Sequence, residues 1–255
     1  MFKNVNEKIY TWAIFNTPFS NVYGLARSII ALSTLIVLLF NGTSTFFRPM
    51  AGINEYPACS IYPISIFCIF PLEFLPIVRW IAILLLVIIA SGYRPRYTGI
   101  IHFWIASSIQ NTAGTLDGGE QVATVLTLLL VPITLLDNRK WHWDKPSTIN
   151  NQNSMRIHAN IISLLFLYAI RIQMSLIYFQ SGIGKLSNPE WIDGTAVYYY
   201  FNDPMLGFND FLLVIFSPIL HSPLVFFISW GTIVLEILLG SLVLFTQKNT
   251  NCSYI

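Results

Sequence analysis

The chain has 255 residues, of which 55% are hydrophobic and only 10% are charged, and its mean hydropathy is +0.62. A soluble domain carries about 25% charged residues, so the composition excludes one and indicates an integral membrane protein that contacts the lipid bilayer. The net charge of +2, from dispersed Lys and Arg residues, argues against a nucleic-acid partner.

The first twenty residues are too polar for a cleavable signal peptide. Asn4, Asn6, Glu7 and Asn16 interrupt the apolar positions, and no small-residue cleavage site follows an apolar core. We expect a short cytoplasmic lead ahead of the first span.

Six stretches are predicted to cross the bilayer as helices. Hydrocarbon about 30 Å thick requires about 20 mostly apolar residues, because backbone groups there must hydrogen-bond to one another. The third stretch is weakly apolar and the fourth is short, and both can span if the bundle shields their polar residues. In chain order the spans are Val22–Phe40, Phe74–Gly92, Tyr97–Ile109, Val122–Leu136, Ile157–Phe179 and Leu224–Phe245.

A further apolar stretch, Phe211–Leu220, has only about half the length of a span. Pro218 and Pro223 are expected to break it, so we predict an interfacial or re-entrant segment. The sequence shows no internal repeat and no soluble second domain. The predicted fold is all-α, a polytopic transmembrane helical bundle that forms a single domain over residues 1–255.

The distribution of Lys and Arg orients this bundle, because these residues prefer cytoplasmic loops. With the N-terminus in the cytoplasm, the loops on the other side hold only Arg48 and Lys185. Arg27 is near the inner end of the first span, where we expect it to anchor the helix at the membrane surface. The basic residues on the inner side are Lys3, Lys8, Arg27, Arg94, Arg96, Arg139, Lys140, Lys145, Arg156 and Lys248.

Two outer loops carry further candidate features. Cys59 and Cys68 lie in the first of them, where an extracytoplasmic disulfide is permitted and an unpaired role fits equally well. Asn111–Gln121 concentrates acids, amides and glycines, including Asp117 and Glu120. This loop fits a site for a polar substrate or a metal, and it also fits a solvated turn.

The fifth span and the residues after it give the most informative pattern. If the helix continues to Lys185, then Arg171, Ser175, Tyr178, Gly182 and Lys185 share one stripe that is about 21 Å long. A basic residue at each end of a polar seam suggests a lined cavity. The small residues before Lys185 would let a ligand or a neighbouring helix approach the backbone.

Lys185 ends this stripe on the outer side. Burial disfavours the ammonium form, so a dry site would make Lys185 a usable base or amine nucleophile. Alternatively, Lys185 extends to the headgroups or pairs with Glu190 or Asp193.

Arg171 and Glu236 are ionisable residues deep inside predicted spans, where a charge is costly unless it is paired or faces a cavity. A structural ion pair between them and a functional role are both open. The four histidines have no metal-ligand spacing, so no metal site is predicted. No Walker, G-x-S-x-G or H-E-x-x-H motif occurs either.

The segment YFQSGIGKLSNPEWIDG, Tyr178–Gly194, resembles the signature of the vitamin-K-dependent gamma-carboxylase and its bacterial relatives, the HTTM (horizontally transferred transmembrane) superfamily. The residues on that pattern are Tyr178, Gly182, Lys185, Leu186, Trp191 and Gly194. The resemblance implies that Lys185 acts as the catalytic base, and by analogy alone it points to a quinol as cofactor.

Two further segments, Phe19–Asn41 and Leu116–Trp143, resemble more particularly the sporulation-delaying-protein B (SdpB-like) branch. This resemblance implies a bacterial cell-membrane protein that acts with an SdpA-like partner and a toxin precursor peptide in maturing a secreted antimicrobial peptide. Gly184 replaces a second lysine of the carboxylase, and no large lumenal domain is visible, so glutamate carboxylation is not implied. The chain stops at Ile255, earlier than the resemblance implies, and both a natural end and a truncation fit.

The sequence therefore nominates Lys185 as a base in an outer-leaflet cavity. Whether the protein is an enzyme is open, because a non-catalytic membrane scaffold, or an immunity or transport protein, is the alternative. The residues expected to support or line the cavity are Arg171, Tyr178, Trp191, Asp193, Asp117, Glu120 and Glu236.

Overall fold

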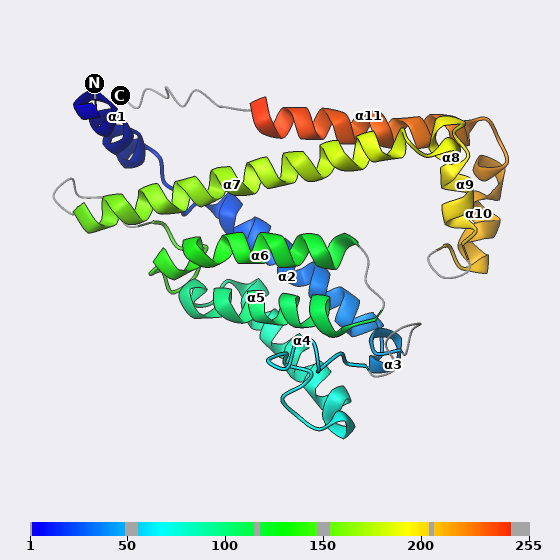
Figure 1. Ribbon diagram of the computed structural model, residues 1–255, viewed down its shortest axis with the longest axis horizontal. Helices are drawn as coiled ribbons and strands as arrows, with labels where there is room; N and C mark the ends of the chain where they lie inside the picture. The colour runs from blue at the N-terminus through cyan, green and yellow to red at the C-terminus, as the bar shows by residue number, and fades with distance from the viewer. Residues whose placement is uncertain (1, 49–55, 115–117, 147–153, 204–206, 246–255) are drawn as a thin grey trace. The chain divides into compact units, whose positions relative to one another are not determined.

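The computed structural model describes residues 2–48, 56–114, 118–146, 154–203 and 207–245, and within these ranges the chain forms helices and no β-strand (Figure 1). The predicted all-α class is confirmed. Five helices are long and apolar enough to cross a membrane, so the chain is a multi-pass membrane protein. These candidate spans are Asn21–Phe40, Leu72–Ser91, Gly118–Leu136, Ser154–Lys185 and Leu224–Val243.

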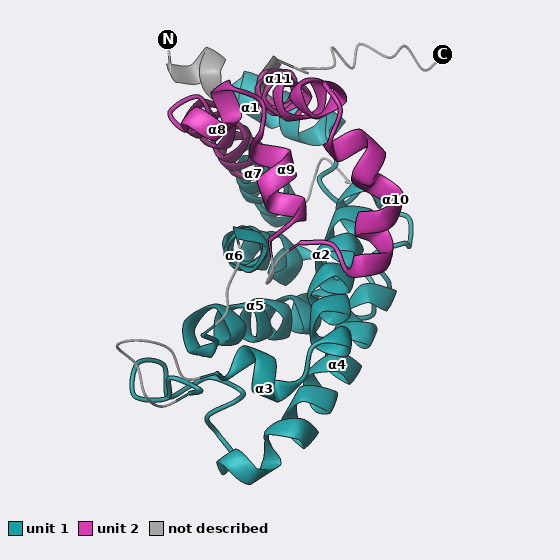
Figure 2. Cartoon of the chain, turned by 90° about the vertical axis from the view of Figure 1, so that its right-hand side faces the viewer, with its two compact units in different colours: residues 1–168 teal, residues 169–255 magenta. Residues whose placement is uncertain are grey.

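The chain divides into two compact units, residues 1–168 and 169–255 (Figure 2). The single domain stays a prediction. The helices that lie wholly in the first unit are α1 (Phe2–Phe15), α2 (Asn21–Phe40), α3 (Thr43–Phe46), the 3-10 turn η1 (Leu72–Phe74), α4 (Leu75–Ser91), α5 (Pro95–Thr112) and α6 (Gly118–Leu136). Helix α7 (Ser154–Lys185) continues into the second unit, which also holds α8 (Pro189–Ile192), α9 (Ala196–Phe201), α10 (Asp210–Leu220) and α11 (Leu224–Phe245).

The core of the first unit lies between α2, α4 and α5, around buried residues such as Leu38, Leu86 and Ile105. Ser20 caps α2 by accepting a hydrogen bond from the Tyr23 N–H, and Gly92 ends α4 in the left-handed conformation that glycine favours. Large apolar side chains remain exposed along α2 and α4, as expected of helices that face lipid.

Helix α5 covers the third predicted span but is less apolar than the five candidate spans, so its crossing of the membrane stays a prediction. Its polar side chains face the interior of the unit, where Thr98, His102 and Ser108 are buried. The hydroxyl of Thr124 on α6 donates to the Ala106 carbonyl of α5. The bundle thus shields the polar face of α5, as the sequence required.

The structure decides two questions that the sequence raised: whether Cys59 and Cys68 pair, and whether Pro218 breaks its apolar segment. Cys59 and Cys68 form a disulfide, so the paired alternative is the one adopted. Helix α10 contains Pro218 and continues to Leu220, so the expectation that Pro218 breaks this segment was wrong. Pro218 lies in the last turn of α10, where it removes one N–H from the helix ladder, and the hydrogen bonds of the other residues keep the segment helical.

The second unit packs around Trp191, Ala196, Val197, Leu220 and Ile233, which come from α8, α9, α10 and α11. Helix α7 is continuous from Ser154 to Lys185, which is the condition for the predicted stripe. The C-terminal half of α7 therefore presents its polar positions on one side.

Candidate functional site

Helices α7 and α11 approach each other closely in the second unit, where Figure 1 draws them side by side. The Ser175 hydroxyl donates to the Gly240 carbonyl at 2.7 Å. A Cβ on Gly182 would lie 2.9 Å from Cγ1 of Ile237, so the absence of a side chain there allows this packing. The predicted approach of a neighbouring helix to the small residues before Lys185 is therefore observed at Gly182.

This packing places Lys185 of α7 against Glu236 of α11. The Lys185 Nζ donates to Glu236 Oε1 at 2.7 Å and to Oε2 at 2.6 Å, and also to the Ser181 hydroxyl at 2.8 Å. The two charged side chains retain only 18% and 22% of their exposure. An ammonium that donates to three oxygens is held in one position, away from most of the surrounding solvent.

Trp191 completes the cluster. Its ring centroid lies 5.1 Å from the Lys185 Nζ, within the range of a cation–π contact. The side chain of Asn188 caps the short helix α8 by accepting the Glu190 N–H, and the Trp230 indole N–H donates to the Ile192 carbonyl. These contacts hold Trp191, which is 9% exposed, beside the ion pair.

The partner of Lys185 differs from those that the sequence suggested. Glu190 and Asp193 were the expected alternatives for an ion pair, whereas the structure supplies Glu236 from another helix. Glu236 was in turn considered as a partner of Arg171, which lies about 21 Å further back along α7. Sequence spacing reveals neighbours on one helix, and Glu236 is 51 residues away from Lys185.

The other candidate residues have varied positions. Tyr178 is half-buried on α7, and Asp193 Oδ1 accepts hydrogen bonds from the Thr195 hydroxyl and N–H, which lower the pKa of this exposed carboxyl. Glu120 lies in the first turn of α6 in the first unit, so its association with Lys185 stays a prediction. Asp117 lies outside the described residues.

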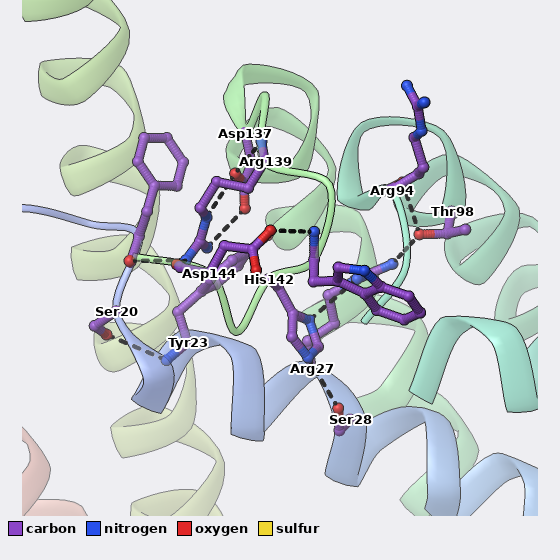
Figure 3. Close-up of polar contacts among 12 residues, drawn as sticks. Ser20, Tyr23, Arg27, Ser28, Arg94, Thr98, Asp137, Arg139, His142 and Asp144 are labelled. Atoms are coloured by element: carbon purple, nitrogen blue, oxygen red, sulfur yellow. Dashed lines mark hydrogen bonds and ion pairs between the residues drawn. The ribbon is translucent and has the colours of Figure 1, made fainter. Parts of the chain in front are cut away.

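A second polar cluster surrounds Arg27 on α2, and Figure 3 shows its contacts. Arg27 is fully buried, and its guanidinium donates from Nη1 to Nδ1 of His142 at 3.3 Å and from Nη2 to the Thr98 hydroxyl. The prediction that Arg27 anchors the helix at the membrane surface was wrong. The loop after α6 folds over Arg27 and supplies a partner that sequence spacing does not reveal.

That loop is held by hydrogen bonds from the backbone and from the ring of His142. The backbone N–H of His142 donates to the Gly92 carbonyl at 3.0 Å. The ring Nε2 lies 3.3 Å from the Ser28 hydroxyl, which itself donates to the Ala90 carbonyl. A guanidinium can only donate, so Nδ1 accepts and the proton is on Nε2. The cluster therefore requires a neutral His142.

Arg139, which precedes His142 in the loop after α6, also holds this loop in place (Figure 3). Its Nε and Nη2 donate to the two oxygens of Asp137 at 2.9 and 2.8 Å, and its Nη1 donates to the carbonyls of Phe19 and Asp144. The carboxylate of Asp144 accepts the Trp141 N–H at 2.9 Å. The guanidinium of Arg139 is thus bound by groups of the protein itself, and Asp137 balances its charge.

Acidification is expected to destabilise the first unit through His142. Burial, and then the charges of Arg27 and Arg139, lower the pKa of His142 to about 4, against the opposing effect of Asp137. The unfolded chain binds the proton near pH 6.5, so stability is complete above that pH and falls between pH 6.5 and 4 by up to about 3 kcal/mol. The unfolding temperature, measured at a series of pH values in an uncharged detergent, reports this change. His142→Gln should flatten the dependence of the unfolding temperature on pH between pH 6.5 and 4. An unchanged profile would contradict the role of His142.

No group of three His, Cys, Asp or Glu side chains converges as metal ligands would, within the ranges that the structure describes. Among the site residues, the sequence identified Lys185 and Trp191 through the motif and Glu236 through its charge. It missed Arg27 with His142. The signal that could have indicated this pair was Arg27 itself, because a charged residue inside an apolar span requires a partner.

Comparisons with known proteins place the chain in a family. No family model and no solved structure matches it. It is 41% identical over 251 residues to the uncharacterized protein YitO of Bacillus subtilis (strain 168), across 98% of this chain and 79% of YitO. It is 38% identical over 227 residues to the sporulation-delaying protein SdpB of the same organism, across 88% of this chain and 68% of SdpB. The chain therefore belongs to the SdpB family of multi-pass membrane proteins.

Proposed function

We propose that this protein is a maturation factor for a secreted antimicrobial peptide of the sporulation-delaying type, embedded in the bacterial cell membrane, with Lys185 and Glu236 as its reactive pair. The similarity to SdpB supports the process. The observation that carries the chemistry is the contact between the Lys185 Nζ and the Glu236 carboxylate on two apolar helices.

The pair is suited to moving one proton. Transfer of a proton from the Lys185 ammonium to the Glu236 carboxylate leaves a neutral amine and a neutral acid, with no change in total charge. The neutral amine then accepts a proton from an acidic group of the substrate, and Lys185 serves as a general base.

The partners in this proposal are an SdpA-like protein and the toxin precursor peptide, which approach from the outer side. The resemblance of Tyr178–Gly194 to the HTTM signature suggests a quinol as cofactor, which would supply an acidic hydroxyl when bound. The Lys185 amine and the aromatic ring of Trp191 fit such a group in their chemistry. Tyr178, Asp193 and Arg171 of the second unit are the further candidates for lining the site.

The sharpest test replaces Lys185 with Arg. Arginine keeps the positive charge beside Glu236 but does not lose its proton, so it preserves an ion pair and removes the base. Peptide maturation, scored in a strain that supplies the partner and precursor, should fall at least about 100-fold, while the amount of protein in the membrane stays unchanged.

Lys140→Arg is the matched control, since Lys140 is an exposed residue of the loop after α6 and should tolerate the same substitution. Normal peptide maturation by the Lys185→Arg variant would contradict the role of Lys185 as a general base. It would favour a non-catalytic scaffold in which the ion pair only holds α7 and α11 together.

A further inference from the structure

The first unit contains a cavity of about 800 Å³ that is separate from the Lys185 cluster. Its wall is formed by the segment between α1 and α2, the start of α5, the end of α6 with the loop that follows, and the first turns of α7. A cavity of this volume is large enough for a small ligand.

Basic side chains dominate the polar part of this wall. Arg96, Arg139, Lys145 and Arg156 face two carboxylates, Asp137 and Asp144. Asp137 is neutralised by its two hydrogen bonds from Arg139, and both groups are nearly buried (Figure 3). The cavity therefore has an excess of positive charge after its internal ion pair is formed.

Two of these cations have donor groups left for a ligand. Arg96 donates from Nε to the Leu135 carbonyl, and its two terminal nitrogens make no hydrogen bond to any residue that the structure describes. The Nζ of Lys145 has no such bond within the same ranges, and both side chains are exposed. A planar guanidinium and an ammonium are the groups that proteins use to bind phosphate.

The rest of the wall is apolar. Phe19, Leu136, Pro146, Met155 and Ala159 line it. Leu136 ends α6, and Met155 lies in the first turn of α7, so the cavity is at the end of two candidate membrane spans. A ligand with an anionic head and an apolar body matches both parts of the wall, and the end of a span is at the depth of the lipid headgroups.

We propose that this cavity binds the phosphate headgroup of an anionic phospholipid, with Arg96 and Lys145 holding the phosphate and the apolar wall contacting the first part of the lipid chains. The positive-inside rule places these loops on the cytoplasmic side, where anionic lipids attract basic segments. This proposal is independent of any chemistry at Lys185.

The test titrates phosphatidylglycerol into the purified full-length protein in a neutral detergent and follows the unfolding temperature. Phosphatidylglycerol should raise it with a saturable dependence, because a ligand that binds the folded state stabilises it. Phosphatidylcholine and inorganic phosphate, at matched concentrations, should have little effect. Added salt should weaken the response.

The double substitution Arg96→Gln and Lys145→Gln should weaken the affinity for phosphatidylglycerol about 25-fold, since each cation near the headgroup contributes about fivefold. The matched control is Arg94→Gln with Lys140→Gln, which removes the same charge from exposed residues outside the cavity wall. Its affinity should stay within about twofold of the unsubstituted protein. Lys145→Gln alone, in an exposed loop, should fold normally and weaken binding about fivefold.

Equal loss in the two double variants would overturn the proposal, because it would indicate general attraction to a basic surface. A stabilisation by inorganic phosphate equal to that by phosphatidylglycerol would overturn the lipid assignment in favour of a soluble phosphate compound. Equal stabilisation by phosphatidylcholine would contradict the role of charge.

Discussion

Replacing Lys185 with Ala is expected to cost about 3 kcal/mol of unfolding free energy, the largest effect of any single substitution at the candidate site. The substitution leaves the Glu236 carboxylate on an apolar helix without its cation, at a position that keeps only 22% of its side-chain exposure. The partial exposure puts the value at the lower end of the range for a broken buried pair. Unfolding in detergent, followed by helical circular dichroism, measures the change.

The matched double variant is Lys185→Met with Glu236→Leu, which removes both charges and keeps similar side-chain volumes. Its stability should be close to that of the unsubstituted protein, because apolar replacement of a buried ion pair is often neutral or stabilising. If the double variant lost as much stability as Lys185→Ala, the ion pair would not be the cause. A stable double variant without peptide maturation would separate the chemistry of the pair from its effect on folding.

Gly92→Ala is expected to destabilise the first unit by about 3 kcal/mol, the second large effect. Gly92 ends α4 with φ of +89°, where a side chain is strained. A Cβ there would also lie 2.4 Å from Cδ2 and Nε2 of His142 and would displace the ring. The displaced ring would lose its hydrogen bonds to Arg27 and Ser28, which would leave a buried guanidinium with fewer partners.

Gly231→Ala is the control for this substitution. Gly231 lies inside α11, and beyond its chain neighbours and the nearby backbone of its own helix no described atom is within 4 Å of an added Cβ. Alanine in a helix interior is favoured over glycine by about 1 kcal/mol, so stability should stay equal or rise. Equal destabilisation by the two variants would show that His142 and the left-handed turn are not the reason for the effect of Gly92→Ala.

Local patterns predicted the helices well, because each depends on residues close together in the chain. An apolar stretch must form helix in lipid whatever its neighbours are, and α2, α4, α6, α7 and α11 follow the predicted spans closely. The effect of Pro218 within α10 was less predictable. Pro218 changes one hydrogen bond of that helix, and its neighbours decide whether the helix continues.

Pairs between distant segments were beyond the reach of the sequence. Arg27 and His142 are 115 residues apart, and their contact depends on the loop after α6 folding back onto α2. The position of Arg27 near the inner end of a span favoured an anchor, although a charged group inside an apolar helix needs a partner. Spacing on the helix could not choose the partner, because helical periodicity relates residues of one element only.

The amino-acid sequence by itself determined that this is an all-α membrane protein, where its spans lie, and that Lys185 and Trp191 belong to one motif. Composition and apolar length suffice for the fold class and the spans, because lipid leaves the backbone few alternatives to helix, whereas the motif comes from the resemblance to a known family. Only the tertiary structure decided that Lys185 pairs with Glu236, that Arg27 is buried with His142, and that basic and apolar side chains share one cavity. These arrangements arise from the packing of helices, which brings together side chains that no local pattern relates.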